Sequence, residues 1–245
     1  MKAMIFSAGL GTRLKPITDT MPKALVPVCG QPLLYHVITK LVAAGYDDLV
    51  VNVHHFPDQI IHYLHSHDFG ARIAVSDERD FLRETGGGIR FAAPLLTGEP
   101  FLVHNVDIVS NLDLGWLREQ HREGAMATLV VSERKTQRYF LFDEDNRLKG
   151  WTNIATGEVR SPFPGIDPDR CRKLAFAGIH LISPAIFAAF DKYGFGDRFS
   201  IVDFYLRACA DYPIYASVPP DFTLVDVGKK ETLSEAERVC EAILR

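Results

Sequence analysis

The sequence lacks the features that mark several large classes of protein. Its four cysteines, Cys29, Cys171, Cys209 and Cys240, form no CxxC pair and no dense framework of the kind that staples small secreted domains. No apolar run approaches the length of about 20 residues needed to cross a bilayer. The short apolar start, residues 3–6, does not fit a signal peptide. These absences predict reduced, mostly buried thiols and a cytoplasmic location.

A strong excess of one charge sign is also absent. Lys and Arg number 27 against 31 Asp and Glu, so the formal net charge is -4. This balance offers no broad attraction to a nucleic-acid backbone or an anionic membrane, and we expect neither as a partner. Repeats, low-complexity tracts and linkers are missing too, which predicts one domain over residues 1–245. The composition does not define an oligomeric state.

What the sequence does contain is an alternation of short apolar runs with segments of helical spacing. Runs with strand character begin at Lys2, Asp48, Arg72, Phe101 and Ala127. Between them, apolar residues recur at helical spacing over 34–42 and 60–64. This alternation predicts the α/β class, as a Rossmann-like three-layer sandwich with a mostly parallel, mixed central sheet.

The second half of the chain is less regular and predicts a small elaboration on that sheet. Residues 140–151 resemble a hairpin around Asp145 and Asn146, and a Pro- and Gly-containing loop follows over 161–169. The run over 174–182 predicts another strand. The last segment, 229–245, carries apolar residues on one face and predicts an amphipathic closing helix.

A glycine loop follows the first predicted strand, at the edge where open α/β sheets bind their ligands. Gly9 and Gly11 let backbone amides approach phosphate oxygens, while Arg13, Lys15 and Lys23 supply positive charge. The loop is neither a Walker A motif, because the GK[ST] ending is missing, nor a dinucleotide fingerprint, because its third glycine is missing. A bare strand-to-helix turn is the alternative interpretation of the loop taken alone.

Two aspartates lie at the ends of predicted strands far apart in the chain. Asp107 follows the apolar run at 101–103, and Asp226 lies in TLVDVG near the C-terminus. Carboxylates that meet at one sheet edge suit Mg²⁺, which prefers oxygen ligands. Taken singly, each aspartate is more simply interpreted as a turn or helix N-cap residue.

Three consecutive glycines at 86–88 precede a predicted helix. Such a segment lets the backbone approach a base or ribose, and amides at a helix N-terminus meet acceptors there. Close packing of the helix start against the sheet is the alternative. Five histidines over 54–67 match no zinc framework and are interpreted as a solvated helix face.

The stretch from Gly9 to Leu33 resembles the N-terminal signature of the sugar nucleotidyltransferases, GxGTRLxPxTxxxPKxLxPVxGxPL. The matching residues are Gly9, Gly11, Thr12, Arg13, Leu14, Pro16, Thr18, Pro22, Lys23, Leu25, Pro27, Val28, Gly30, Pro32 and Leu33. Asp107 matches the metal-binding aspartate of the family's N-G-D or similar turn, with Val106 where glycine is usual. Asp226 matches the second, in a V-D-[IV]-G turn.

The resemblance implies a site for a nucleoside triphosphate and a sugar 1-phosphate, with Mg²⁺ as cofactor. It implies catalytic roles for Arg13, Lys23, Asp107 and Asp226, of which the two aspartates bind the metal. The implied nucleotide-binding residues are Ala8, Gly9, Gly11, Thr12, Arg13, Lys23, Gly86 and Gly87. The implied sugar-binding residues are Asn105, Tyr139 and Gly178. Residues 1–130 would then mainly bind nucleotide and 131–225 the sugar, with no hexapeptide-repeat domain.

Within the family, the whole chain is most similar to the short uridylyltransferases that act on N-acetylmuramate 1-phosphate in cell-wall recycling. Guanylyl transfer to mannose 1-phosphate and thymidylyl or uridylyl transfer to glucose 1-phosphate are the alternatives. They stay open because Arg138 and Tyr139 depart from the usual sugar contacts. An alternative of another class is a nucleotide-sensing subunit without turnover, which the joint presence of the four catalytic residues disfavours.

Overall fold

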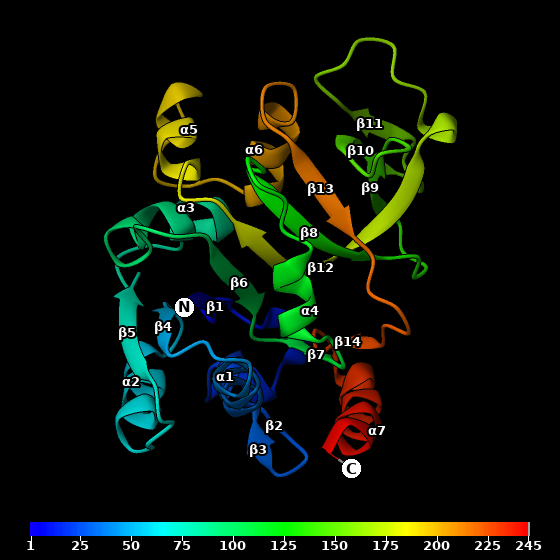
Figure 1. Ribbon diagram of the computed structural model, residues 1–245. Coiled ribbons are helices and arrows are strands. Elements are labelled where there is room, and N and C mark those ends of the chain that lie inside the picture. Colours follow the sequence, from blue (N-terminus) through cyan, green and yellow to red (C-terminus); the bar gives the residue numbers. More distant parts are fainter. Residues whose placement is uncertain (245) are drawn as a thin grey trace.

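The apolar runs expected to be strands form a mixed sheet in the computed structural model, which describes residues 1–244 (Figure 1). The strands are β1 Lys2–Phe6, β4 Asp48–Val53, β5 Arg72–Asp77, β6 Phe101–Asn105, β8 Ala127–Ser132, β9 Arg138–Phe142, β10 Leu148–Asn153, β11 Glu158–Arg160, β12 Arg172–Ile182 and β13 Ile214–Ser217. Their order is β11-β10-β9-β12-β6-β1-β4-β5, with β8 between β12 and β13. Neighbours within β6-β1-β4-β5 are parallel, as predicted.

Helices cover both faces of this sheet and complete the predicted three layers (Figure 1). They are α1 Leu33–Ala43, α2 Pro57–His65, α3 Glu84–Phe91, α4 Leu114–Glu119, α5 Ile186–Lys192, α6 Ile201–Ala208 and α7 Leu233–Leu244. Because successive strand residues face opposite sides, Ala3 and Ile5 of β1 pack in the core beneath α1, α2 and α7. Met4 packs in the core beneath α3, α5 and α6.

Two small sheets lie outside the main one. β2 (Pro27–Val28) and β3 (Gln31–Pro32) form a hairpin between the glycine loop and α1. β7 (Ile108–Ser110) pairs antiparallel with β14 (Leu224–Asp226). This second pairing places the C-terminal aspartate next to the turn that follows β6.

The predicted elaboration forms an antiparallel extension of the sheet. β9 and β10 make the expected hairpin, and β11 pairs with β10. Strand β12 joins the extension to the sheet, since its first residues pair with β9 and its last residues pair with β6 and β8. Its register changes between Phe176 and His180, where Gly178 has a φ of 74°.

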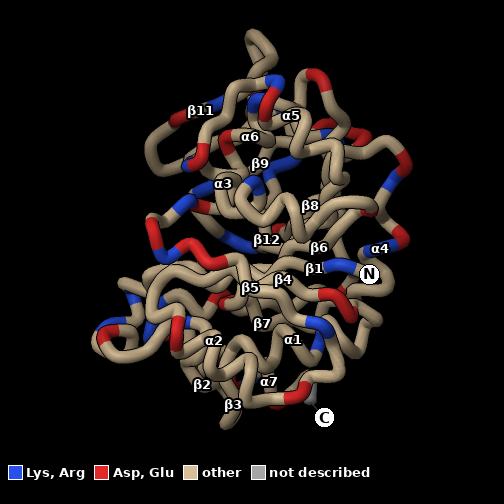
Figure 2. Tube along the Cα trace, turned by 90° about the vertical axis from the view of Figure 1, so that its left-hand side faces the viewer, with Lys and Arg blue, Asp and Glu red and all other residues tan. Residues whose placement is uncertain are grey.

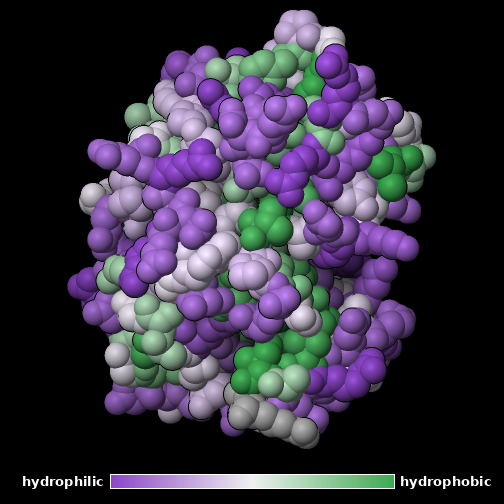
Figure 3. Space-filling model, turned by 45° about the vertical axis from the view of Figure 1, so that its right-hand side comes forward, coloured by the Kyte–Doolittle hydropathy of each residue, from purple (hydrophilic) through white to green (hydrophobic). Residues whose placement is uncertain are grey.

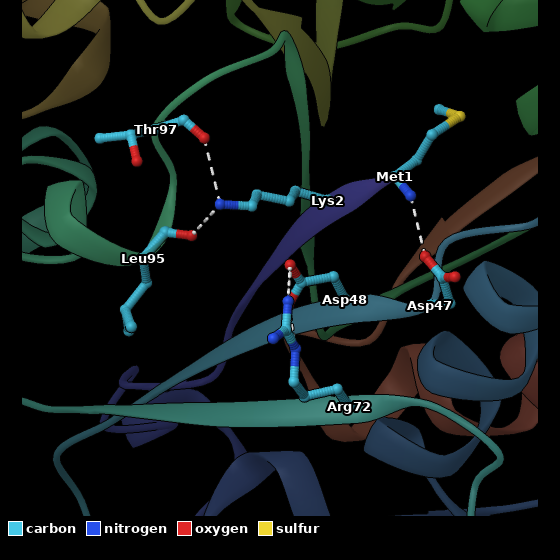
Figure 4. A network of polar contacts seen from close by, with 7 residues as sticks. All are labelled: Met1, Lys2, Asp47, Asp48, Arg72, Leu95 and Thr97. Atoms are coloured by element: carbon cyan, nitrogen blue, oxygen red, sulfur yellow. Dashed lines mark hydrogen bonds and ion pairs between the residues drawn. The ribbon is translucent and has the colours of Figure 1, made fainter.

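Polar contacts tie down the edge of the sheet where the parallel strands begin (Figure 4). The Met1 amino group lies 2.8 Å from Asp47, and the Arg72 guanidinium lies 2.6 Å from Asp48. The Lys2 ammonium donates to the carbonyl oxygens of Leu95 and Thr97 at 3.0 and 3.1 Å. The loops that carry the motifs lie at the opposite edge, where the parallel strands end.

Acidic and basic residues are interspersed along the trace (Figure 2). Apolar side chains gather on the lower part of the face drawn in Figure 3. Within residues 1–244, none of the helices has both the length and the apolarity that a bilayer-spanning segment requires. All four cysteines are free thiols; Cys209 and Cys240 are buried, whereas Cys29 and Cys171 are only partly so.

Candidate active site

The glycine loop forms one wall of a cavity of about 560 Å³ at the edge where β1 and β6 end. Residues 6–13 supply this wall, and Asn105, Val106 and Asp107 supply another. Of the nucleotide-binding residues expected from the sequence, it is lined by Ala8, Gly9, Gly11, Thr12, Arg13 and Lys23. The structure therefore brings the first motif and the first aspartate to one site.

The loop has the tight backbone that its glycines suggested. Gly11 has a φ of 62°, and a Cβ placed on it would lie 2.8 Å from the Thr18 Cγ2 atom. The Thr18 hydroxyl donates to the Gly11 carbonyl oxygen at 2.8 Å. Next, residues 12–14 form a 3₁₀ turn that buries Leu14 and leaves Arg13 exposed at the cavity. Glycine at 11 is thus required by backbone conformation and by space.

A network of buried polar side chains supports this loop and was not predicted from the sequence. The Asn52 Oδ1 atom accepts from the backbone amides of Ser7 and Ala8 at 2.7 and 3.3 Å, and its Nδ2 atom donates to Glu78 at 2.8 Å. Burial raises the pKa of the Glu78 carboxyl. The available signal was Asn52 itself, a lone polar residue inside the apolar run of β4.

Asp107 lies in the turn between β6 and β7 and forms an ion pair with Lys23. Lys23 is only 8% exposed. It is the first residue of a 3₁₀ turn over Lys23–Leu25, and Pro22 before it has an extended backbone. A nearly buried ammonium beside a carboxylate is held in place by that charge. The pair fixes a cation on the wall of the cavity.

Asp226 adjoins the same place from the other end of the chain. The amide of Val227 donates to the Asp107 carbonyl oxygen at 2.8 Å, so the two motifs are hydrogen bonded. Burial raises the pKa of the Asp226 carboxyl, and the negative charge of Asp107 adds to the rise. Lys23, Arg13 and Arg134 act in the opposite direction. The predicted cluster of Arg13, Lys23, Asp107 and Asp226 therefore forms.

The two aspartates fit a divalent cation. The Asp226 Oδ1 atom is buried and has no hydrogen-bond partner among residues 1–244, although an unpaired buried polar atom is costly. A cation beside Asp107 and Asp226 would satisfy that oxygen and offset the repulsion between the carboxylates. Two protein carboxylates, with the rest of the octahedron taken from phosphates and water, are typical of Mg²⁺ sites. No group of three or more His, Cys, Asp or Glu side chains that could hold a metal occurs within residues 1–244, so the protein would supply only these two carboxylates.

A second cavity of about 560 Å³ adjoins the first, and the two share Arg13 and Gly228. Its walls come from β9, β10, β12, α6 and the segment after β14. The lining residues are Arg13, Arg134, Thr136, Arg138, Phe140, Trp151, Phe176, Val202, Asp226, Gly228, Lys229 and Thr232. Two connected cavities with the charged cluster at their junction can hold two substrates with their reacting groups between them.

The residues expected to bind sugar are placed differently from one another. Asn105 lines the first cavity, and a Cβ on Gly178 would lie 2.5 Å from the Asn105 Nδ2 atom, so Gly178 makes room for that side chain. Tyr139 lines neither cavity, and its hydroxyl oxygen accepts from the Thr136 amide at 2.9 Å. Its neighbours Arg138 and Phe140 line the second cavity instead.

Gly86 and Gly87 lie within α3 and line neither cavity. Both backbone amides donate to the Phe199 carbonyl oxygen, at 2.9 and 3.2 Å. A Cβ on Gly86 would lie 2.2 Å from the Phe199 ring. Close packing, the alternative weighed from the sequence, describes their contacts, while Glu84 and Thr85 line the first cavity beside them.

Gly87→Ala is expected to lower the free energy of unfolding by about 1–3 kcal/mol, the usual cost of overpacking. The added Cβ would lie 2.2 Å from the Asp197 carbonyl oxygen, a backbone atom that cannot rotate away. Urea unfolding followed by circular dichroism measures the change. Gly196→Ala is the matched control, because Gly196 precedes Asp197 in the chain but has nothing within 4 Å of an added Cβ. Equal stabilities of the two variants would contradict the packing interpretation.

The structure also places Lys15 and Val106, two positions that were singled out in the sequence. The Lys15 ammonium lies 3.0 Å from Asp19 and lines neither cavity, so it adds no charge to the site as the sequence had suggested. Val106, which stands where glycine is usual, is 4% exposed and packs in the core. Its amide donates to the Phe6 carbonyl oxygen at 3.1 Å. The branched side chain is thus accommodated without displacing Asp107 from the site.

The molecule also has a larger cavity, of about 720 Å³, between α1, β7 and α7. It contains none of the predicted catalytic residues, and its walls are mainly apolar. A ligand pocket for polyphosphate needs convergent charged groups. Those groups lie in the two smaller cavities, which are therefore the candidate site.

Both the sequence and the fold of this chain are similar to those of known proteins. The model of the nucleotidyl transferase family matches residues 2–146. N-acetylmuramate alpha-1-phosphate uridylyltransferase of Caulobacter vibrioides is 34% identical over 98% of this chain and 97% of its own length. Mannose-1-phosphate guanyltransferase of Emericella nidulans is 36% identical over 54% of this chain and 38% of its own. The fold is that of HddC from Yersinia pseudotuberculosis, with a TM-score of 0.77 at 21% identity over 97% and 98% of the chains.

Proposed function

The chain belongs to the nucleotidyl transferase family, and we propose that it transfers uridylate from UTP to N-acetylmuramate 1-phosphate. At the level of the class, it is an enzyme that joins a nucleoside monophosphate to a sugar 1-phosphate and releases pyrophosphate. The observation that carries the proposed site is the junction of the two cavities. There Arg13, Lys23, Asp107 and Asp226 converge although they come from three distant parts of the sequence.

The reaction needs no covalent enzyme intermediate. A phosphate oxygen of the sugar 1-phosphate attacks the α-phosphorus of the triphosphate in line, and the bond between the α-phosphorus and the departing pyrophosphate breaks. Arg13 and Lys23 offset the charge that builds on the α-phosphate and on the leaving group. Positioning of two anions at the junction, against their mutual repulsion, is the main work of the protein.

We propose that Asp107 and Asp226 hold Mg²⁺. The unpaired Asp226 Oδ1 atom and the raised pKa of that carboxyl support this assignment. The bound metal would polarise the phosphate oxygens and orient the triphosphate. The ion pair between Lys23 and Asp107 would keep the ammonium next to those phosphates.

The choice of UTP and N-acetylmuramate 1-phosphate rests on the full-length similarity to the Caulobacter protein. A matrix of five nucleoside triphosphates against a panel of sugar 1-phosphates, with Mg²⁺ and pyrophosphate release as readout, tests it. The highest kcat/KM is expected for UTP with N-acetylmuramate 1-phosphate. Preference for GTP with mannose 1-phosphate would move the chain to the guanylyl transfer of its shorter match. No turnover with any pair would favour a nucleotide-sensing subunit.

A further inference from the structure

The positive charge of the second cavity lies at more than one place. Its charged lining residues are the cations Arg13, Arg134, Arg138 and Lys229 and the single carboxylate of Asp226. Arg13 is shared with the first cavity and lies beside Asp226, whereas Arg138 lies at the start of β9. A ligand with an acid group apart from its phosphate would match cations at two places.

Arg13 and Lys229 lie at the end of this cavity that adjoins the first cavity. A Cβ on Gly228 would lie 2.7 Å from both the Arg13 Nη2 atom and the Asp226 Oδ1 atom, so these groups surround the same point. Lys229 is the next residue along the chain. They are therefore placed to meet the 1-phosphate.

Arg138 is separate from this group. It is exposed at the start of β9. No salt bridge or side-chain hydrogen bond joins its guanidinium to another of residues 1–244, and only its backbone amide is engaged, by Thr136. By contrast, the Arg134 guanidinium donates to the Phe176 carbonyl oxygen at 3.1 Å. Arg138 thus offers an unengaged guanidinium to a ligand in the cavity.

Aromatic side chains provide the surface between the charged groups. Phe140 lies on the same face of β9 as Arg138, and it is paired in register with Trp151 of β10. The Phe140 and Phe176 ring centroids are 5.7 Å apart. These rings can pack against the apolar face of a sugar while its polar substituents reach the cations.

We propose that Arg138 recognises a carboxylate on the sugar and so makes the enzyme selective for acidic sugar 1-phosphates. The inference rests on the proposed transfer to a sugar 1-phosphate. A guanidinium binds a carboxylate through two parallel hydrogen bonds, which a lysine ammonium or a glutamine amide cannot reproduce. The carboxylate can belong to an ether substituent, as in N-acetylmuramate, or to the ring, as in a uronic acid.

The test compares kcat/KM for N-acetylmuramate 1-phosphate with that for N-acetylglucosamine 1-phosphate, which lacks the carboxylate. The wild type is expected to prefer the acidic sugar. Arg138→Gln is expected to lower the ratio of the two kcat/KM values by about 10–100-fold, the range of one charged hydrogen-bonded contact, and Arg138→Lys to lower it less. Arg172→Gln, an exposed β12 arginine that bonds Asn146 at 2.5 Å outside the cavity, is expected to leave the ratio unchanged.

Glucuronate 1-phosphate against glucose 1-phosphate, measured in the same variants, tells which carboxylate the arginine reads. An equal loss of kcat/KM with acidic and neutral sugars in Arg138→Gln would overturn the inference, because it would place Arg138 at the shared phosphate or in the structure of the site. So would a wild type that turns over both sugars without preference, although the proposed nucleotidyl transfer would then stand. No turnover with any sugar 1-phosphate would contradict the proposed function itself.

Discussion

Asp107→Ala is expected to lower kcat by about a hundredfold or more, as the loss of a metal anchor or of a preorganised charge does. Asp107 shares the junction of the two cavities with Asp226 and forms an ion pair with Lys23. Its removal takes away one proposed ligand of the metal and frees an ammonium that is nearly buried. Both changes disturb the charges set against the α-phosphate.

Steady-state pyrophosphate release at saturating UTP, sugar 1-phosphate and Mg²⁺ measures this effect. Asp19→Ala is a suitable control, because Asp19 lies near the glycine loop but pairs with Lys15 outside the cavities. Its kcat is expected to stay within about twofold of the wild type, as for an exposed ion pair of little energetic weight. A near wild-type kcat in Asp107→Ala, with circular dichroism showing an intact fold, would rule out the assigned role.

Stability is expected to fall steeply between pH 7 and pH 5 because of two buried histidines. Burial lowers the pKa of His104 from 6.5 to about 4 and that of His180 from 6.5 to about 3. Below about pH 6.5 the unfolded chain binds a proton on each ring, whereas the folded chain keeps both rings neutral until about pH 4 and 3. The free energy of unfolding therefore decreases as pH falls through this window, by about 2 kcal/mol for each histidine at pH 5.

Urea unfolding at pH 7 and at pH 5 checks this loss. His180→Asn is the informative variant, because an asparagine oxygen can replace the ring Nδ1 atom that lies 2.6 Å from the Tyr205 hydroxyl. The variant is expected to lose about half of the pH dependence, even if its stability at pH 7 is lower. A wild-type stability that changes by less than about 1 kcal/mol over this interval would show that the rings are protonated in the folded state.

The sheet and the glycine loop were predictable because their signals are local. Buried parallel strands appear as short apolar runs, and the loop that follows β1 carries its glycines and cations within a few residues of one another. The meeting of Asp107 with Asp226 was also expected, since both follow strands. The strand pairing that brings the two aspartates together could not be predicted from the sequence. A three-residue strand such as β14 has too little periodicity to indicate that its partner is β7.

The sugar side of the site was less predictable for two physical reasons. Side chains alternate across a strand, so an error of one position moves a residue to the other face. Tyr139 was expected to contact sugar, but Arg138 and Phe140 are the β9 residues that line the second cavity. At α3, the three glycines could serve a ligand or close packing, and only tertiary contacts distinguish these. The nearness of Phe199 and Asp197 to Gly86 and Gly87 could not be seen in the sequence.

The most direct test of the proposed function follows the α-phosphate. The enzyme is incubated with UTP labelled at the α-phosphorus, N-acetylmuramate 1-phosphate and Mg²⁺, and the labelled products are separated. Label is predicted to appear in the nucleotide sugar in an amount equal to the pyrophosphate released, and only when both substrates are present. Label recovered as free uridine monophosphate, or pyrophosphate released without the sugar phosphate, would contradict nucleotidyl transfer at this site.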